Sequence, residues 1–364
     1  MKEAGTMPPK SLVHFIPARA AEGPESLSEK AVRLFNRLGL DKHIAKDTYV
    51  ALKTHFGEKG NTGHIKPAWM SGVVSLIRKR TSRVFFTDSN TLYMSHRSNA
   101  VDHTLLAWQH GFGSSQVDIP VIIADGLLGQ DGQDIKADLP HVKTAKIGSA
   151  IVHSEVMVCF SHLTGHVLSG IGGAIKNLGM GCASRAGKLE QHSDVHPRIS
   201  PKACRNCGIC LDYCPNQAIS QAEGSARIND AQCLGCGECL TVCKYGAVKF
   251  RWGEDSRRMQ EKMAEYALAV KGLFKEKIGF LNFVLNVTKD CDCMSTAQKP
   301  VVEDIGLLAS TDPVALDRAC VDLVLAKAGA DVFRKGYNLD WAVQLDHGEK
   351  IGLGTQAYEL QEMK

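Results

Sequence analysis

Cysteine is the residue type whose spacing points most directly to chemistry in this chain of 364 residues. Eight of the 13 cysteines form two runs of the pattern C-x2-C-x2-C-x3-C, namely Cys204, Cys207, Cys210 and Cys214, then Cys233, Cys236, Cys239 and Cys243. Two-residue spacers let three thiolates surround one face of a compact inorganic core, and this spacing is typical of iron-sulfur ligation. The sequence therefore predicts two 4Fe-4S clusters.

The fourth cysteine of each run is expected to bind the cluster of the other run, because it points away from its own loop. We assign cluster one to Cys204, Cys207, Cys210 and Cys243, and cluster two to Cys233, Cys236, Cys239 and Cys214. The second run repeats the first at an offset of 29 residues, which indicates an internal duplication. A pair of structural zinc sites is the alternative, but such sites usually separate their CxxC pairs by longer gaps.

Residues 197–250 resemble the bacterial two-cluster 4Fe-4S ferredoxin domain, and the resemblance implies electron transfer. The second run has Lys244 where the first has Pro215, but neither residue binds iron. The segment carries six Lys and Arg residues against four Asp and Glu residues, whereas free ferredoxins are typically acidic. We therefore expect a tethered domain.

Three further cysteines lie in loops rich in glycine or aspartate: Cys182, Cys291 and Cys293. Brought together, they would form a three-thiolate site with one open position, suited to a third cluster or another soft metal. Plain reduced thiols and a redox-active pair are the alternatives. Cys159 and Cys320 lie in apolar segments, where a small hydrophobic role is expected.

Strand and helix patterns alternate on both sides of the cysteine-rich segment. Strands are predicted over 48–54, 83–87, 121–124, 155–160, 280–287 and 302–308, and helices from 67 and over 99–110, 259–275 and 313–327. This alternation predicts an α/β fold, a mostly parallel sheet with helices on both faces. We expect residues 1–196 and 251–364 to form two parts of one α/β domain, interrupted by a small α+β ferredoxin-like insert at 197–250. Two separate α/β domains flanking the insert are the alternative.

Polar side chains follow several predicted strands, and open parallel sheets bind ligands at the carboxyl ends of their strands. The candidate catalytic residues are His55, Glu58, His162, Lys176 and Asp312. Each also has a structural interpretation: His55 and Glu58 lie in a glycine-rich turn, His162 can position its loop, and Asp312 can cap a helix begun by Pro313. The glycine-rich loop around Lys176 offers either anion binding or close backbone packing.

Five segments together resemble the domain of unknown function 362 family: KTHFGEKGNTGHIKPAW at 53–69, FTDSNTLY at 86–93, GGAIKNLGMGCASRAGK at 172–188, DCDC at 290–293 and STDPVALDRACVDL at 310–323. Members of this family often carry an inserted double-cluster ferredoxin and are labelled iron-sulfur centre proteins. The resemblance supports the insertion but implies no reaction.

Composition excludes several classes of protein. Hydrophobic residues at 44% and charged residues at 23% are ordinary for globular proteins and argue against a disordered or fibrous chain. The net charge is only +4 and no basic run stands out, so we expect no nucleic-acid partner. We also expect no membrane span and a cytoplasmic location, because no long apolar stretch or secretion signal is present.

These features predict an iron-sulfur electron-transfer protein, an oxidoreductase or a component of one, that passes single electrons through two clusters to a site on the α/β domain. Its expected partner is a redox protein or a small-molecule electron donor or acceptor. The alternatives are a non-catalytic relay that docks a partner oxidoreductase and an iron-sulfur redox sensor.

Overall fold

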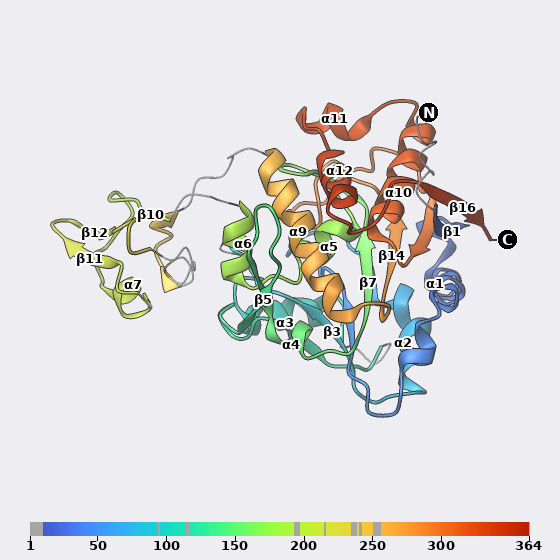
Figure 1. Ribbon diagram of the computed structural model, residues 1–364, viewed down its shortest axis with the longest axis horizontal. Coiled ribbons are helices and arrows are strands. Elements are labelled where there is room, and N and C mark those ends of the chain that lie inside the picture. The colour runs from blue at the N-terminus through green and yellow to red at the C-terminus, as the bar shows by residue number, and fades with distance from the viewer. Residues whose placement is uncertain are drawn as a thin grey trace, which may run out of the picture.

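The computed structural model describes residues 10–93, 95–113, 117–192, 197–214, 216–233, 239, 242–249 and 256–363. An eight-stranded sheet forms the centre of the molecule, in the order β16-β1-β15-β14-β7-β2-β3-β4 (Figure 1). Its strands are β1 Ser11–Pro17, β2 Val50–Lys53, β3 Val84–Asp88, β4 Val121–Ile123, β7 Val156–His162, β14 Ile278–Val284, β15 Gly306–Ser310 and β16 Tyr358–Glu362. Both flanks of the cysteine-rich segment contribute strands, so they build one sheet.

Seven of these strands point the same way. Neighbours from β14 to β4 are parallel, and β1 is parallel to β16. Only β15 is antiparallel, to both β1 and β14. The predicted mostly parallel α/β fold is therefore confirmed, but β15 ends at the opposite edge of the sheet from its neighbours.

Helices cover both faces of the sheet. One face packs against α1 Pro24–Leu38, α2 Ser71–Arg78 and α3 Ala100–Gln109, and the other against α5 Ala174–Gly179, α9 Ser256–Phe274, α10 Pro313–Ala328 and α12 Val343–Lys350. Side chains alternate between the two cores along β2, where Val50 and Leu52 face the first set and Ala51 faces the second. Burial on both faces explains the continuous apolar runs of these strands.

Helix starts follow the local capping chemistry expected from the sequence. The Asp312 carboxylate accepts hydrogen bonds from the backbone N–H groups of Val314 (2.9 Å) and Ala315 (3.0 Å) at the start of α10. The Asn99 side chain likewise accepts one from the Asp102 N–H before α3. The remaining elements of the α/β unit are η1 Ala20–Glu22, η2 Leu40–His43, η3 Pro67–Met70, β5 Gly132–Lys136, β6 Thr144–Gly148, α4 Ser149–Val152, β8 Thr164–His166, β9 Gly170–Gly172, α6 Arg185–His192 and α11 Val332–Tyr337.

The cysteine-rich segment forms a small body beside the α/β unit (Figure 1). It contains β10 Arg198–Ile199, α7 Ile209–Asp212, β11 Ile219–Ala222, β12 Ser225–Ile228 and β13 Val248–Lys249. Ile199 pairs with Val248, and Ile228 pairs with Ile219. Ile228 follows Ile199 by 29 residues, and Val248 follows Ile219 by 29 residues, so the sequence offset relates the two strand pairs. The structure thus repeats the duplication seen in the sequence.

Across the described ranges, none of the helices has both the length and the apolar character that crossing a bilayer requires.

Candidate functional site

A cavity of about 420 Å³ lies where the strand order of the sheet reverses. The chain steps outward from β2 to β3 and β4, then returns to the other side of β2 with β7, and such a switch point is where open α/β sheets bind ligands. Strand ends and the loop after β14 supply much of its lining: Lys53, His55, Asp88, Ser89, Ser161, His162, Cys291, Asp292 and Cys293. Helices supply the apolar wall, including Met180, Met259 and Met263.

Lys53 and Asp88 form a buried ion pair at the base of this cavity. The last residues of β2 and β3, they approach to 2.9 Å between Nζ and Oδ1. The Lys53 ammonium also donates to the side-chain oxygen of Asn177 at 2.6 Å. Burial opposes ionisation of Asp88, but the charges of Lys53 and His103 outweigh it and lower the pKa of the carboxyl. The Asp88 carboxyl therefore remains ionised beside the Lys53 side chain.

Lys176, in contrast, points its ammonium into the cavity without a neutralising partner. Within the described parts of the chain, no hydrogen bond or ion pair of this ammonium group is found. Burial, reinforced by the charge of Arg97, lowers the pKa of Lys176 to about 8. An ammonium of this kind is stabilised by any anion that enters the cavity.

Cationic groups outnumber carboxylates around the cavity. Its lining includes the positively charged side chains of Lys53, Arg97, Lys176 and Lys188, against the carboxylates of Asp88 and Asp292. Lys188 donates to the Ser89 hydroxyl (2.5 Å) and the Asn90 carbonyl (2.6 Å), and burial lowers its pKa to about 8. This charge balance favours a small anionic ligand.

His55 lines the cavity as a neutral imidazole. Its Nδ1 accepts a hydrogen bond from the Gly57 N–H at 3.0 Å. Burial and the charges of Arg97 and Lys176 hold the pKa of His55 well below its ordinary value. With Nδ1 acting as acceptor, the ring hydrogen resides on Nε2 and is available as a donor to a bound ligand.

Glu58 lies behind the cavity rather than in its lining. Its carboxylate accepts a hydrogen bond from the Arg97 Nε at 3.1 Å, and both side chains are buried. Arg97 in turn donates to the Tyr93 hydroxyl at 2.9 Å and reaches the cavity wall. Glu58 thus holds Arg97 in place, which is a positioning role.

His162 fixes the Cys-Asp-Cys loop through a buried charge pair. Its Nδ1 lies 2.9 Å from Asp292 Oδ2, and its Nε2 lies 2.7 Å from the Leu285 carbonyl oxygen. Both partners are acceptors, so both ring nitrogens donate. Burial opposes the charge, but Asp292 and these hydrogen bonds outweigh it and raise the pKa of His162. His162 is therefore a clamp for the loop, with neither nitrogen free for catalysis or metal binding.

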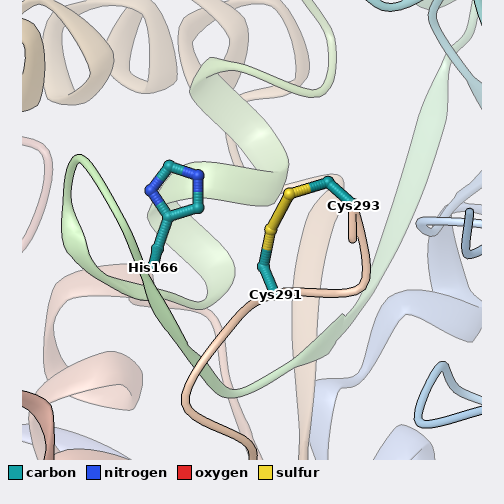
Figure 2. Close-up of side chains that lie close together, drawn as sticks. All are labelled: His166, Cys291 and Cys293. Carbon is teal, nitrogen blue, oxygen red and sulfur yellow. A yellow bond between two sulfur atoms is a disulfide. The ribbon is translucent and has the colours of Figure 1, made fainter. Parts of the chain in front are cut away.

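Cys291 and Cys293 are joined by a disulfide in the cavity wall, beside His166 (Figure 2). The two Sγ atoms and a ring nitrogen of His166 all lie within 4.8 Å of one another. This group and the cysteine-rich composition are compatible with metal binding.

Cys182 does not join that group, so the three cysteines predicted to share a metal are not brought together. Its thiol lies in the apolar core with α5, 4.0 Å from the Asn177 carbonyl oxygen, and burial raises its pKa to about 12. Close packing in that core accounts for its position.

Asp312 also lies elsewhere, contrary to the prediction from strand ends. Because β15 is antiparallel, its carboxyl end is at the opposite edge of the sheet. There the second Asp312 carboxylate oxygen accepts hydrogen bonds from the Ser11 hydroxyl (2.7 Å) and the Thr355 N–H (2.9 Å). Asp312 is a structural residue that caps α10 and holds the C-terminal segment.

The glycine-rich loop before Lys176 serves close packing. The N–H groups of Ala174 and Ile175 donate to the Asp317 carboxylate at 2.7 and 2.9 Å, so they are not available to an anion. A Cβ on Gly173 would overlap the same carboxylate. From this segment, it is the Lys176 side chain that carries the positive charge into the cavity.

The four cysteines assigned to cluster one surround a second, small cavity in the cysteine-rich segment. Its lining contains Cys204, Cys207 and Cys210 of the first run together with Cys243 of the second. Of the other set, Cys214, Cys233 and Cys239 are described, and Cys236 lies outside the described residues.

Backbone N–H groups point at the cysteine sulfurs in both repeats. The N–H of Ala218 donates to Cys214 Sγ at 3.2 Å, and the equivalent N–H of Ala247 donates to Cys243 Sγ at 3.2 Å. Asn206 donates in the same way to Cys204 at 3.3 Å. Such N–H···S bonds stabilise the negative charge that thiolates carry when they bind iron.

The candidate residues chosen from the sequence did not include five charged or amide side chains at the main cavity: Lys53, Asp88, Arg97, Asn177 and Lys188. Two of them carried a usable signal. Lys53 and Asp88 end otherwise apolar strands, and a charge at that position of a buried strand must find a partner or a ligand.

Comparison with known proteins adds a family and two distant structural similarities. The family described as "Domain of unknown function (DUF362)" matches residues 50–322. The lactate racemase apoprotein from Thermoanaerobacterium thermosaccharolyticum aligns at 13% identity and TM-score 0.41 over 85% of this chain and 56% of its own. A structural-genomics protein from Thermotoga maritima aligns at 9% identity and TM-score 0.43 over 85% and 59%. This chain thus spans little more than half the length of either structure. No curated protein matches it.

Proposed function

This chain belongs to the DUF362 family, and we propose that it is an iron-sulfur redox enzyme acting on a small anionic ligand. The eight cysteines within residues 197–250 would hold two 4Fe-4S clusters, which would supply single electrons to the cavity at the β2/β7 switch point. A redox protein or a small-molecule donor supplies those electrons.

The way the cysteine-rich segment is attached carries this proposal. The chain leaves the α/β unit at the end of α6, where His192 lines the cavity. It returns at the start of α9, where Met259 lines the same cavity. Ser256, the first residue of α9, donates a hydrogen bond to the carbonyl of Leu168, another lining residue. Both junctions of the electron-transfer segment therefore border the site.

The chemistry of the donor set supports the clusters. Four thiols line one small cavity, three from the first run and Cys243 from the second. This is the arrangement expected if the fourth cysteine of each run binds the cluster of the other run. The clusters, when bound, supply one-electron transfer. The chain's own contribution is the set of N–H groups that donate to sulfurs of Cys204, Cys214 and Cys243 and so favour the reduced, more negative state.

At the main cavity, the charged side chains and His55 bind and orient the ligand. The Lys176 ammonium attracts the negative charge of the ligand, and the Nε2–H of His55 provides a directed hydrogen bond. The Lys53–Asp88 pair and the Glu58–Arg97 pair fix the charges around it. Apolar side chains such as Met259 and Met263 exclude water on the other side.

The test begins with anaerobic purification and iron analysis. We expect about eight irons per chain, with a cluster signal in the electron paramagnetic resonance spectrum after reduction. Cys207→Ala should lose about half of the iron, whereas Cys320→Ala, at a cysteine buried in the α/β core, should retain all of it. The reduced protein is then mixed with small anionic metabolites, and reoxidation is followed by absorbance.

Two results would oppose the proposal. Iron-free protein, or zinc in place of iron, would remove the electron-transfer role. Clusters that are reoxidised by partner proteins but by no small anion would favour a relay instead of an enzyme.

A further inference from the structure

We propose that Cys291 and Cys293 form a redox-active disulfide/dithiol pair that accumulates two electrons at the cavity, with His166 donating a hydrogen bond to the reduced sulfur. The inference deepens the proposed function, on which it rests for its source of electrons. A disulfide/dithiol pair stores two electrons, whereas each cluster transfers only one. The cavity would therefore contain a two-electron centre of its own.

The position of the pair suits this role. Cys291 and Cys293 lie two residues apart in the loop after β14, with their Cα atoms 5.3 Å apart. Both line the cavity. Cys291 is buried and Cys293 is more exposed, so Cys293 is the sulfur that a ligand can reach.

The hydrogen bonds of His166 make it a donor toward these sulfurs. Its Nδ1 faces the backbone N–H groups of Leu168 (3.3 Å) and Ser169 (3.1 Å), which can only donate, and the Ser169 hydroxyl (2.8 Å), which can donate or accept. With Nδ1 as the acceptor of these N–H groups, the ring hydrogen of the neutral imidazole is on Nε2. In Figure 2 the outer ring nitrogen, Nε2, lies on the side that faces the disulfide. An N–H directed at sulfur stabilises a thiolate.

The same hydrogen bonds argue against a metal between His166 and the two cysteines. A metal would take the Nε2 lone pair and leave the hydrogen on Nδ1, where histidine ligands normally donate to a carbonyl or carboxylate. Here Nδ1 faces two backbone N–H donors and the Ser169 hydroxyl, and no carbonyl or carboxylate. The site is therefore arranged for a thiolate rather than for a cation.

The residue between the two cysteines is immobilised. Asp292 is held by the His162 clamp, and its backbone carbonyl accepts from the Glu58 N–H at 2.9 Å. Both contacts are independent of the sulfur–sulfur bond. The two sulfurs thus remain close together when that bond opens, which favours its reversible closure.

The reaction balances with the electrons that the proposed clusters carry. The two clusters that the eight cysteines would hold would supply two electrons, one from each reduced cluster. The sulfur–sulfur bond takes both electrons and one proton from solvent in the cavity, and breaks to give the Cys291 thiol and the Cys293 thiolate. In the reverse direction the pair returns two electrons, with loss of that proton, to a reducible anion held by Lys176.

The first test counts electrons in the iron-loaded protein. Anaerobic titration should deliver about four electrons per chain to the oxidised wild type, one per cluster and two for the disulfide. Cys291→Ser/Cys293→Ser should take up about two, with unchanged iron content and cluster absorbance. The matched control, Cys159→Ala/Cys320→Ala, removes two cysteines of the α/β core and should behave as wild type.

The second test needs no clusters, so it separates this inference from the proposed function. Oxidised full-length protein is alkylated before and after treatment with dithiothreitol. The mass of the peptide containing residues 291 and 293 is then measured by mass spectrometry. Two additional alkyl groups after reduction are expected. If this peptide already carries two alkyl groups before reduction in air-oxidised protein, the redox-active disulfide is wrong, even when the clusters are present. If the protein is iron-free but the disulfide is intact, only the clusters as the source of electrons are wrong.

The role of His166 is tested by the reactivity of the reduced pair. His166→Phe keeps an aromatic ring but removes the N–H, so alkylation of Cys293 at pH 7 should slow about tenfold, and its pH profile should move to higher pH. His166→Gln, which retains an N–H donor, should recover part of the rate. Unchanged rates in both variants would overturn the donor role. A ninth metal ion, lost in Cys291→Ser/Cys293→Ser, would overturn the redox pair in favour of a metal site.

Discussion

At the scale of single residues, the Lys176 ammonium group combines a cost in stability with a use in binding. A half-buried cation without an ion-pair partner destabilises the folded chain, and an entering anion relieves that penalty. The pKa of Lys176, lowered to about 8 by burial, expresses the same penalty as a preference for the neutral amine.

Replacing this lysine should stabilise the protein. We expect Lys176→Met to raise the free energy of unfolding at pH 7 by about 1–3 kcal/mol, the usual cost of an unsatisfied buried polar group. Between pH 8 and 10.5 the unfolded chain binds more protons at this site than the folded one, so wild-type stability gains on the variant as the pH rises. Urea unfolding from pH 7 to 10 measures both effects. Lys79→Met, at an exposed lysine, is the control and should change neither.

Breaking the clamp of the Cys-Asp-Cys loop should have the opposite effect. Asp292→Asn leaves the His162 charge buried without its partner, and we expect a loss of about 3–5 kcal/mol at pH 6. The raised pKa of His162 means that the pair's contribution is present at pH 6.5 and is lost as the pH rises through the folded-state value. The variant should therefore approach wild type in urea unfolding at pH 9. A deficit that stays constant from pH 6 to 9 would contradict this, and Asp134→Asn, on the exposed β5, is the control.

How far individual site residues could be predicted depended on what each side chain contacts. His55 and His162, chosen from strand ends, and Lys176, chosen from its glycine-rich loop, all line the cavity. The sequence could not tell that Glu58 is occupied by Arg97, because that contact joins two loops. Asp312 was misplaced because capping and catalysis use the same residue types at helix starts.

At the scale of elements, the contact between α5 and α9 positions Lys176. Gly179, at the end of α5, lies directly against the backbone of α9, where a Cβ would overlap the Met263 carbonyl oxygen. The glycine is required here for close approach of two helices.

A methyl group at this contact should be costly. Gly179→Ala should lower the free energy of unfolding by about 1–3 kcal/mol, because the helices must separate. Gly272 lies in α9, and a Cβ added there has no atom within 4 Å. Gly272→Ala should therefore raise the free energy of unfolding by about 0.5–1 kcal/mol through helix propensity. Chemical denaturation of both variants checks this contrast, and equal effects would refute it.

Most strand positions were predicted from apolar runs, but β1 and β16 were not, and neither was the direction of β15. The apolar runs located β2, β3, β4, β7 and β14 to within a few residues. A buried strand has the same apolar sequence pattern whether it runs parallel or antiparallel to its neighbours. The residues 302–308 therefore gave no indication that β15 is antiparallel. That reversal, in turn, decides which strand-end residues share an edge.

At the scale of the whole molecule, the cysteine-rich segment contributes no strand to the eight-stranded sheet. Removing residues 197–249 and joining 196 to 250 should therefore leave a folded α/β unit. We expect cooperative thermal unfolding within a few degrees of the full chain, an intact Cys291–Cys293 disulfide and no bound iron. Circular dichroism and iron analysis measure these, and an unfolded product would show that the two parts depend on each other.

The partners of β1 set the order in which this protein can mature during synthesis. The Ser310 hydroxyl donates a hydrogen bond to the Leu12 carbonyl, 298 residues away, and β1 lies between β15 and β16. The strand β1 therefore cannot pair until residues 306–362 have been synthesised. Strand pairs of the cysteine-rich segment, by comparison, close within 197–249. Local contacts form faster than distant ones. The cysteine-rich segment can thus fold, and bind the proposed clusters, before the eight-stranded sheet is complete.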